Sequence, residues 1–481
     1  MINKSPIQEL IPDDLNPQSS QNARPPYLYE ALISFMSLFI IMSISIMVYN
    51  TDPHMPMLLG VMAAAVVAMR LGHSWEDVLK SMYHGIYQAL QAIMILMIIG
   101  VLIGVWILSG VVPTMVSYGL DLISPQFFLI ATLLICSITS LATGTSWGTM
   151  GTMGVALIGI AAGLDIPLPL AAGAIISGAY FGDKMSPLSD TTNLAPVVAG
   201  SDLFTHIKFM MPSTVITYLL AIAFFWYQGM GQSAADVDLG KVQALQSTLA
   251  QHFAINPLLL LPPLLVIVAI AFKVPAIPGI TLGIFSAAIL APIFQEGANL
   301  GALLNVGMNG FKIESGLEAI DELLNTGGLM NMMSSVSLTI IAMMYGGIMD
   351  RTGQLEVIVS YLLRFLKSPA QLVTGTIFTG YVSNATMPEQ YISIVVPGKM
   401  YAKAYEQRGL DAKTLSNALE SGGTVTSALV PWNTCGIFIF SVLGVSTYEY
   451  FAYAFFNYAM PLVVIAMAYV GGITIAYKKA G

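Results

Sequence analysis

The stretch Gly178-Ala-Tyr-Phe-Gly-Asp-Lys-Met-Ser-Pro-Leu-Ser-Asp-Thr-Thr-Asn193 decides the fold, because it puts charged side chains inside otherwise apolar sequence. The charged residues are Asp183, Lys184 and Asp190. A charge at the centre of a bilayer costs about 3 kcal/mol on insertion scales, so such charges usually mark an ion or substrate pathway. The stretch therefore predicts a membrane protein with a polar pathway through it.

The composition agrees with this interpretation. Of 481 residues, 56% are hydrophobic and 9% are charged, whereas soluble domains have about 25% charged residues. Measured against a span length of about 20 residues, the chain has roughly 11 to 13 hydrophobic segments, some of them broken or re-entrant. We therefore predict an all-α polytopic membrane protein that contacts lipid. The sequence has no basic stripe, so we do not expect a nucleic-acid partner.

A polar segment divides the chain into two halves. We predict an N-terminal tail (1–28), a first transmembrane half (29–230), a polar linker (231–256) and a second transmembrane half (257–481). Lys and Arg cluster in particular loops, and the positive-inside rule then places both termini in the cytoplasm.

The two halves resemble each other. Helix-breaking and small residues of the first half recur 244 residues later: Ser177-Gly178, Pro187 and Gly200 correspond to Ser421-Gly422, Pro431 and Gly444. Internal repeats with interrupted hydrophobic segments are typical of secondary transporters, whose substrate site lies where the broken helices meet. The spacing leaves open whether the repeats are parallel or inverted.

Four polar breaks interrupt the apolar sequence. They are the first break (140–149), the second break (183–193), the third break (383–390) and the fourth break (420–434). Each contains Gly or Pro to open a helix, together with hydroxyl or amide side chains. Freed carbonyls and side-chain oxygens can replace the hydration shell of a hard cation such as Na⁺. Thiolate and imidazole clusters are absent from the sequence, which disfavours zinc or copper chemistry.

Pro187 disfavours helix, so Asp183 and Asp190 are expected to flank an unwound turn. There they can bind a proton and Na⁺ in turn. The predicted Na⁺ ligands are Asp183, Ser186, Ser189, Asp190, Thr191, Asn193, Thr145, Ser146, Ser383, Asn384, Thr424, Thr426 and Asn433. Lys184 is a candidate charge partner of Asp190. Glu389 and Glu420 are accessory candidates, and capping of a helix at the membrane interface is an equal alternative for each.

Three runs carry a resemblance to a known family: Thr143-Gly-Thr-Ser-Trp-Gly-Thr149, residues 173–196, and residues 421–436. They resemble the NhaC-type Na⁺/H⁺ antiporter family of the ion transporter superfamily. The resemblance implies a bacterial inner-membrane antiporter for Na⁺ (or Li⁺) and protons that serves pH homeostasis, without a cofactor. It also implies two inverted repeats with re-entrant hairpins, often in a homodimer.

Two alternatives stay open. The family also includes malate/lactate exchangers with cation coupling. A dicarboxylate carrier is expected to offer Arg, and no Arg lies in the four breaks. Helix N-termini can nevertheless bind a carboxylate without Arg. An intramembrane aspartyl protease is disfavoured, because the two aspartates lie on one interrupted segment rich in cation-type ligands.

Overall fold

The computed structural model describes residues 23–49, 51–122, 124–230, 239–272, 274–470 and 472–477. These residues form helices joined by turns, with one isolated bridge between Leu410 and Tyr477, which confirms the predicted all-α class. Within these ranges, six helices are long and apolar enough to cross a membrane, or eight if each of two bent pairs is one span. The number of spans is lower than that of the hydrophobic segments in the sequence, because several segments form shorter helices that end at breaks.

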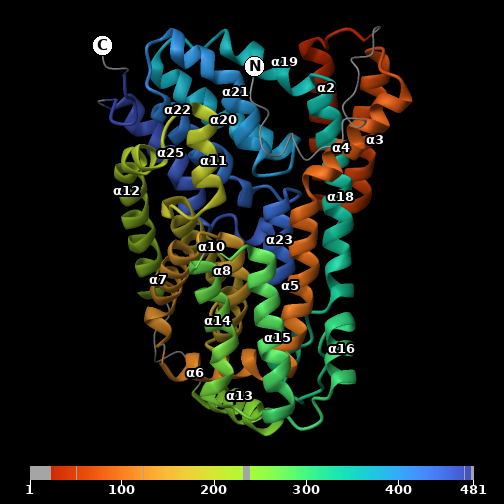
Figure 1. The fold of residues 1–481 in the computed structure, drawn as a ribbon, viewed down its shortest axis with the longest axis vertical. Coiled ribbons are helices and arrows are strands. Elements are labelled where there is room, and N and C mark those ends of the chain that lie inside the picture. The colour runs from red at the N-terminus through yellow and green to blue at the C-terminus, as the bar shows by residue number, and fades with distance from the viewer. Residues whose placement is uncertain are drawn as a thin grey trace.

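The first half begins with a set of helices at the end of the molecule that holds both termini and continues to the opposite end (Figure 1). These helices are α2 (Leu28–Met47), α3 (His54–Arg70), α4 (Trp75–Gln88), α5 (Leu90–Leu108) and α6 (Val111–Leu122). The broken helices follow: α7 (Pro125–Thr143), α8 (Ser146–Thr149), the π-helix η2 (Met150–Gly154), α9 (Val155–Gly163), α10 (Leu168–Met185) and α11 (Asp190–Ala199). The long helix α12 (Leu203–Met230) completes the half.

The second half repeats this order. It starts with η3 (Pro257–Leu260), α14 (Leu261–Ala271), α15 (Ala276–Phe294), α16 (Leu300–Asn309), α17 (Glu318–Leu324), α18 (Leu329–Arg351) and α19 (Gln354–Leu363). Its broken helices are α20 (Pro369–Thr386), α21 (Ile392–Gln407), α22 (Ala412–Leu419), the π-helix η4 (Glu420–Thr424), the 3₁₀ turn η5 (Ser427–Leu429) and α23 (Thr434–Leu443). The half closes with α24 (Thr447–Tyr450) and α25 (Phe455–Tyr469).

The two repeats are inverted. α7 and α20 begin 244 residues apart, as do α10 and α22, and α11 and α23. In Figure 1, α2 and α3 lie at the end that holds the termini, whereas their counterparts α15 and α16 lie in the opposite half of the molecule. Likewise α7 approaches the centre from one end and α20 approaches it from the other. This arrangement agrees with the family resemblance.

Local sequence signals explain why the boundaries repeat. α7 and α20 both carry Pro at their first position, where the missing N–H costs no helix hydrogen bond. α11 and α23 both end at a glycine in the left-handed conformation, Gly200 (φ 83°) and Gly444 (φ 69°). Only glycine adopts this conformation without a steric penalty. The same punctuation at the same spacing therefore produces the same pieces of helix.

Glycines also let the broken helices cross closely. A Cβ atom at Gly178 would lie 2.4 Å from the Leu133 carbonyl oxygen of α7, and one at Gly182 would lie 2.5 Å from that of Ser137. Gly422, the counterpart of Gly178, touches the backbone of α20 in the same way, because its Cβ would lie 2.7 Å from the Cα of Ile377. Each repeat thus holds its two central breaks side by side.

The linker between the halves lies at the end of the molecule away from the termini (Figure 1). Residues 231–238 of the predicted linker, like the predicted tail up to residue 22, lie outside the described residues. Residues 239–252 of the linker form α13 (Leu239–His252), and a short turn (253–256) follows. Residues 242–252 are bent by 96° relative to residues 257–269. α14 and α15 then pack together, and the turn between them reaches the central cavity described next.

Candidate functional site

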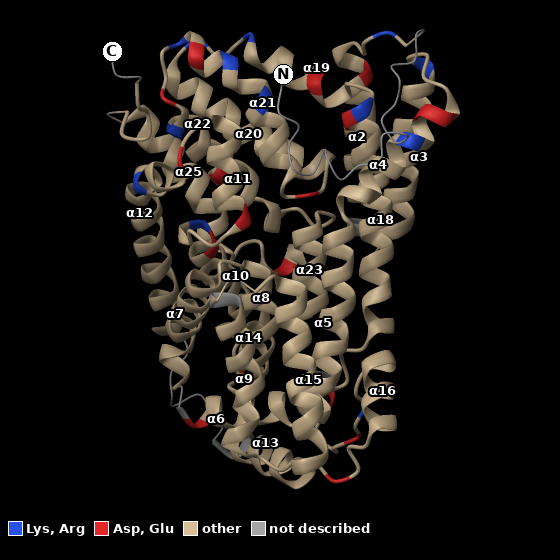
Figure 2. Ribbon diagram, viewed as in Figure 1, with Lys and Arg blue, Asp and Glu red and all other residues tan. Residues whose placement is uncertain are grey.

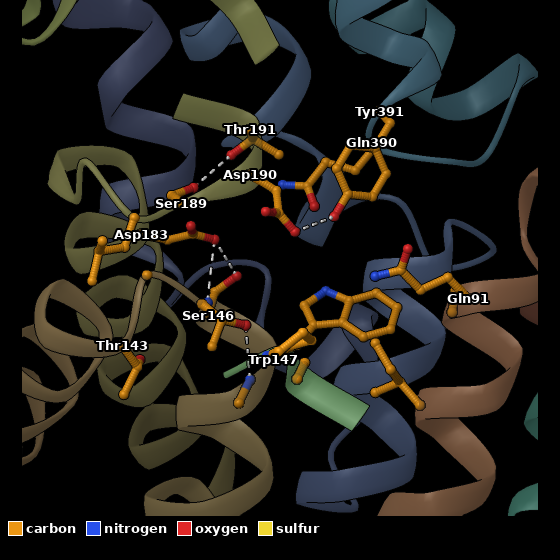
Figure 3. Close-up of a pocket in the computed structure, with 18 of the residues that line it drawn as sticks. Gln91, Thr143, Ser146, Trp147, Asp183, Ser189, Asp190, Thr191, Gln390 and Tyr391 are labelled. Carbon is orange, nitrogen blue, oxygen red and sulfur yellow. Dashed lines mark hydrogen bonds between the residues drawn. The ribbon is translucent and has the colours of Figure 1, made fainter. Parts of the chain in front are cut away.

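A cavity of about 790 Å³ lies where three of the four predicted breaks meet (Figure 3). The lining includes residues 143–148 of the first break, residues 187–191 and Asn193 of the second, and residues 389–390 of the third with the adjoining Tyr391. Asp183, the first residue of the second break, lines the cavity from the end of α10. Residues 87–95 and 274–280 close it from other sides. The described lining residues include none from the fourth break.

Asp183 lies at the end of α10 and faces the start of α8. Its Oδ2 atom accepts hydrogen bonds from the Ser146 backbone N–H at 3.2 Å and from the Ser146 hydroxyl at 2.6 Å. Thr145 caps the same helix start, with its Oγ1 accepting from the Gly148 N–H at 3.1 Å. Asp183 is 6% exposed. Its carboxylate lies at the positive end of the α8 dipole, which favours a negative charge there.

Asp190 is the first residue of α11 and is exposed to the cavity. Its Oδ2 accepts a hydrogen bond from the Tyr391 hydroxyl at 3.3 Å. Ser189 caps the helix and accepts from the Thr192 N–H at 3.3 Å. Figure 3 shows Asp183 and Asp190 on the same side of the cavity. α10 ends at Met185 and α11 begins at Asp190, so the non-helical turn that contains Pro187 separates the two residues along the chain.

Other predicted ligands of the second break hold this turn together. The Ser186 hydroxyl donates to the Leu141 carbonyl at 2.8 Å, and the Asn193 amide donates to the Pro187 and Ser189 carbonyls at 2.9 and 2.7 Å. Asn193 also lines the cavity, whereas Ser186 does not. These contacts fix the positions of the two aspartates.

Glu389 caps a helix, but in the interior of the protein. It is 4% exposed, and its Oε2 accepts from the backbone N–H groups of Tyr391 at 2.6 Å and Ile392 at 3.2 Å, where α21 begins. Glu420 is fully buried in the π-helix η4. The alternative that these residues cap helices at the membrane interface is therefore wrong, because the apolar runs they terminate end at internal breaks.

The remaining predicted ligands form a second polar group beside the cavity. The Asn384 amide donates to the Gly423 carbonyl at 2.7 Å and to Thr426 Oγ1 at 3.1 Å. The Asn433 amide donates to Asn384 Oδ1 at 3.1 Å. The buried side-chain atoms without a hydrogen-bond partner include Ser383 Oγ, Thr424 Oγ1 and Glu420 Oε2. The structure therefore divides the predicted ligands into a cavity set and this inner set.

Lys184 points toward the inner set. It is fully buried, and its Nζ donates to the Ser421 hydroxyl at 3.3 Å. Thr191, in the first turn of α11, is 3.5 Å from Glu420 Oε1. The second and fourth breaks are thus tied together by Lys184 and Thr191, while Asp190 has Tyr391 as its donor.

Several lining residues were not predicted as site residues. Trp147 lines the cavity, and its ring stacks on Phe438 with centroids 4.2 Å apart. Tyr391, Gln390 and Gln91 were overlooked. Gln91 lies within a long uncharged run that is otherwise almost wholly apolar. A polar residue in such a run could have indicated that Gln91 faces a polar site.

A family model and several known proteins are similar to this chain. The model of the Na⁺/H⁺ antiporter family matches residues 24–179 and 178–472. The malate-2H⁺/Na⁺-lactate antiporter of Bacillus subtilis is 39% identical over 452 residues, covering 94% of this chain and 96% of that protein. The Na⁺/H⁺ antiporter NhaC of Alkalihalophilus pseudofirmus is 39% identical over 427 residues, covering 89% and 92%. The solved structure of Neisseria gonorrhoeae MtrF has a TM-score of 0.38 at 13% identity, covering 91% of this chain and 99% of MtrF.

Proposed function

Because this chain belongs to the Na⁺/H⁺ antiporter family, we propose that it exchanges Na⁺ for H⁺ across the bacterial inner membrane by alternating access. Asp183 and Asp190 bind the proton and Na⁺ in turn. A carboxylate supplies the charge that offsets dehydration of the ion, and the neighbouring hydroxyl and amide oxygens supply the rest. In the cavity these oxygens come from Thr145, Ser146, Ser189, Thr191 and Asn193.

The observation that carries the proposal is that the protein's own carboxylates already occupy the helix N-termini at the cavity. Asp183 accepts hydrogen bonds at the start of α8, and Glu389 accepts them at the start of α21. Asp190 lies in the first turn of α11. A helix N-terminus is the usual substitute for Arg in binding an anion. With three carboxylates at these positions, the cavity favours a cation over an organic acid.

Proton and Na⁺ compete for the same oxygens in this scheme. A protonated carboxyl group has lost the charge that holds Na⁺, so loading of one ion excludes the other at that group. Exchange then requires only that the loaded site open to each side of the membrane in turn. The inverted repeats supply two equivalent arrangements about a central site, which is the usual basis of alternating access.

The inner set has a separate place in the proposal. Ser383, Asn384, Thr424, Thr426 and Asn433 are not in the cavity lining, but Ser383 and Thr424 have buried oxygens without a hydrogen-bond partner. We place these oxygens in the ion path of another state of the cycle. Lys184, beside Glu420, balances charge between the two sets.

The distribution of basic residues supports a cytoplasmic location for both termini. Figure 2 shows that most described Lys and Arg residues lie at the end of the molecule that holds the N- and C-termini. The elements at this end include α3, which ends at Arg70, α4, which contains Lys80, and α22, which contains Lys413. Arg364 and Lys367 lie between α19 and α20 in the sequence. By the positive-inside rule this end faces the cytoplasm. A homodimer is the assembly that we expect from the family.

The second candidate is organic-acid exchange, favoured by the similarity to the malate-2H⁺/Na⁺-lactate antiporter. The two candidates are separated in proteoliposomes that contain a pH-sensitive dye. A Na⁺ gradient is imposed with and without malate and lactate. Proton movement driven by Na⁺ alone, and its loss in a correctly folded Asp190→Ala protein, is the expected result.

Proton movement only in the presence of an organic acid would overturn the proposal. The cation to replace first would then be Lys184, which is the single Lys or Arg in the sequence of the four breaks. Full exchange in folded Asp190→Ala protein would overturn the role of that residue while leaving the exchange itself established.

A further inference from the structure

The cavity is far larger than a Na⁺ site requires. Its volume of about 790 Å³ lies within the range of about 300–1,000 Å³ found for sites that bind small organic molecules. One water molecule takes about 30 Å³ in the liquid, so the space exceeds that of an ion with a few waters. The cavity can therefore hold a ligand of several non-hydrogen atoms.

The charged side chains in the described lining select the sign of such a ligand. They are Asp183, Asp190 and Glu389, all carboxylates. Asp183 and Glu389 are buried to more than nine-tenths, and burying an uncompensated charge is costly. An organic anion would add to this negative charge, whereas an organic cation would offset it.

The uncharged part of the lining suits a flat cation with N–H donors. Figure 3 places the Trp147 ring across the cavity from Asp183 and Asp190, with Gln91 on the same side as Trp147. The ring of Trp147 is held by stacking on Phe438, and an aromatic face attracts a cation. Gln91 is exposed in the cavity, and its side-chain amide has no hydrogen bond to any described residue.

We propose that this cavity binds small organic cations with a planar guanidinium group, in competition with Na⁺. Guanidinium N–H groups pair with carboxylates in a bidentate manner, and the planar group stacks on aromatic rings. A quaternary ammonium ion has the charge but no N–H donors. The inference rests on the proposed function insofar as both ligands use Asp183 and Asp190, and it adds a substrate class to the same site.

The test measures displacement of ²²Na⁺ from the purified, detergent-solubilised full-length protein by guanidinium, with tetramethylammonium as the matched control cation. Guanidinium keeps its proton at any assay pH, because a guanidinium side chain has a pKa above 12. It therefore releases no free base that could cross a membrane in follow-up transport assays. We expect competitive displacement by guanidinium and at least tenfold weaker displacement by tetramethylammonium.

The variant Trp147→Leu tests the location of the guanidinium site. Loss of a cation–π contact of about 1–2 kcal/mol corresponds to a loss of about 5- to 30-fold in affinity. We expect the ratio of the guanidinium to the Na⁺ dissociation constant to rise by that factor. Failure of guanidinium to displace bound Na⁺ would overturn the inference, and so would an unchanged ratio in Trp147→Leu.

A failure of the proposed function looks different. If the wild-type protein bound no ²²Na⁺ at all, the Na⁺ assignment would fail, and direct binding of ¹⁴C-guanidinium would decide the present inference. Saturable binding that Trp147→Leu weakens would support it, and absence of binding would overturn it.

Discussion

Because α7 and α10 cross closely, we predict that Gly182→Ala lowers the transport rate strongly and the stability of the protein only slightly. A Cβ atom at position 182 would lie 2.5 Å from the Ser137 carbonyl oxygen and 2.6 Å from the Leu141 nitrogen. Reaching an ordinary contact of 3.4 Å requires a shift of about 0.9 Å between the two helices. Both atoms belong to the backbone, so no side-chain rotation can relieve the clash.

The cost to stability is expected to be modest. Overpacking of this kind costs about 1–3 kcal/mol, and replacing Gly by Ala within a helix returns about 1 kcal/mol. The net loss is therefore about 0–2 kcal/mol. The same shift moves Asp183, the next residue, relative to Ser146, whose hydroxyl lies 2.6 Å from the carboxylate. In enzymes a misplacement of about 1 Å can cost about 100-fold in rate.

We therefore expect Gly182→Ala to fold, with a slightly lowered Tm in detergent, and to lose at least tenfold in Na⁺-driven proton transport in proteoliposomes. Gly307→Ala is the matched control, because the new Cβ would meet only Val101 Cγ1 at 3.5 Å. It should transport normally. Wild-type transport by Gly182→Ala would show that the α7–α10 crossing does not set the position of Asp183.

Three further predictions concern single contacts. Trp432→Phe removes the N–H donor that lies 2.8 Å from the buried Ala385 carbonyl, and the loss of about 1–3 kcal/mol in the free energy of unfolding should lower the Tm. Trp226→Phe changes an exposed residue and should leave the Tm unchanged, so equal Tm values for the two variants would contradict the reasoning. Tyr391→Phe removes the hydroxyl that donates to Asp190, so the Na⁺ concentration for half-maximal transport should change several-fold without a change in Tm. An unaltered Na⁺ concentration for half-maximal transport would show that Tyr391 is not part of the site. Hydrogen bonds from the Ser315 side chain and backbone lower the pKa of Asp321 from 3.8. Asp321→Asn should therefore have a lower Tm than the wild type at neutral pH, and this difference in Tm should vanish as the pH falls below the lowered pKa. A lower Tm of the variant that persists in acid would show that the charge is not the cause.

Features that depend on local chemistry could be read from the sequence. Proline at the first position of α7 and α20 and left-handed glycine after α11 and α23 act through the residues beside them. The glycine pair Gly200 and Gly444, together with Ser177-Gly178 and Pro187 and their counterparts 244 residues later, revealed the repeat. The breaks at Asp183–Asn193 and Ser383–Gln390 appeared as polar interruptions. The all-α membrane class followed from composition in the same way.

Features that depend on how distant segments pack could not be read in this way. Hydropathy does not distinguish a helix that ends at the membrane surface from one that ends at an internal break. For that reason Glu389 and Glu420 could have been interface caps, and the hydrophobic segments outnumber the spans. Lys184 was expected to pair with Asp190 as a neighbour in sequence, but its hydrogen-bond partner Ser421 comes from the other repeat. The division between the cavity set and the inner set has the same origin.

In the proposed exchange cycle, Asp183 and Asp190 hold the transported cation. Binding of ²²Na⁺ to the purified protein tests this assignment most directly, with Asp183→Asn and Asp190→Asn compared with Asp202→Asn. Asp202 is an exposed residue whose carboxylate accepts from the Thr205 N–H at the start of α12, and Asn is an equivalent cap. We expect Asp202→Asn to bind Na⁺ like the wild type, and we expect each of the other two variants, although folded, to lose binding. Wild-type Na⁺ binding by the folded double variant Asp183→Asn/Asp190→Asn would contradict this assignment.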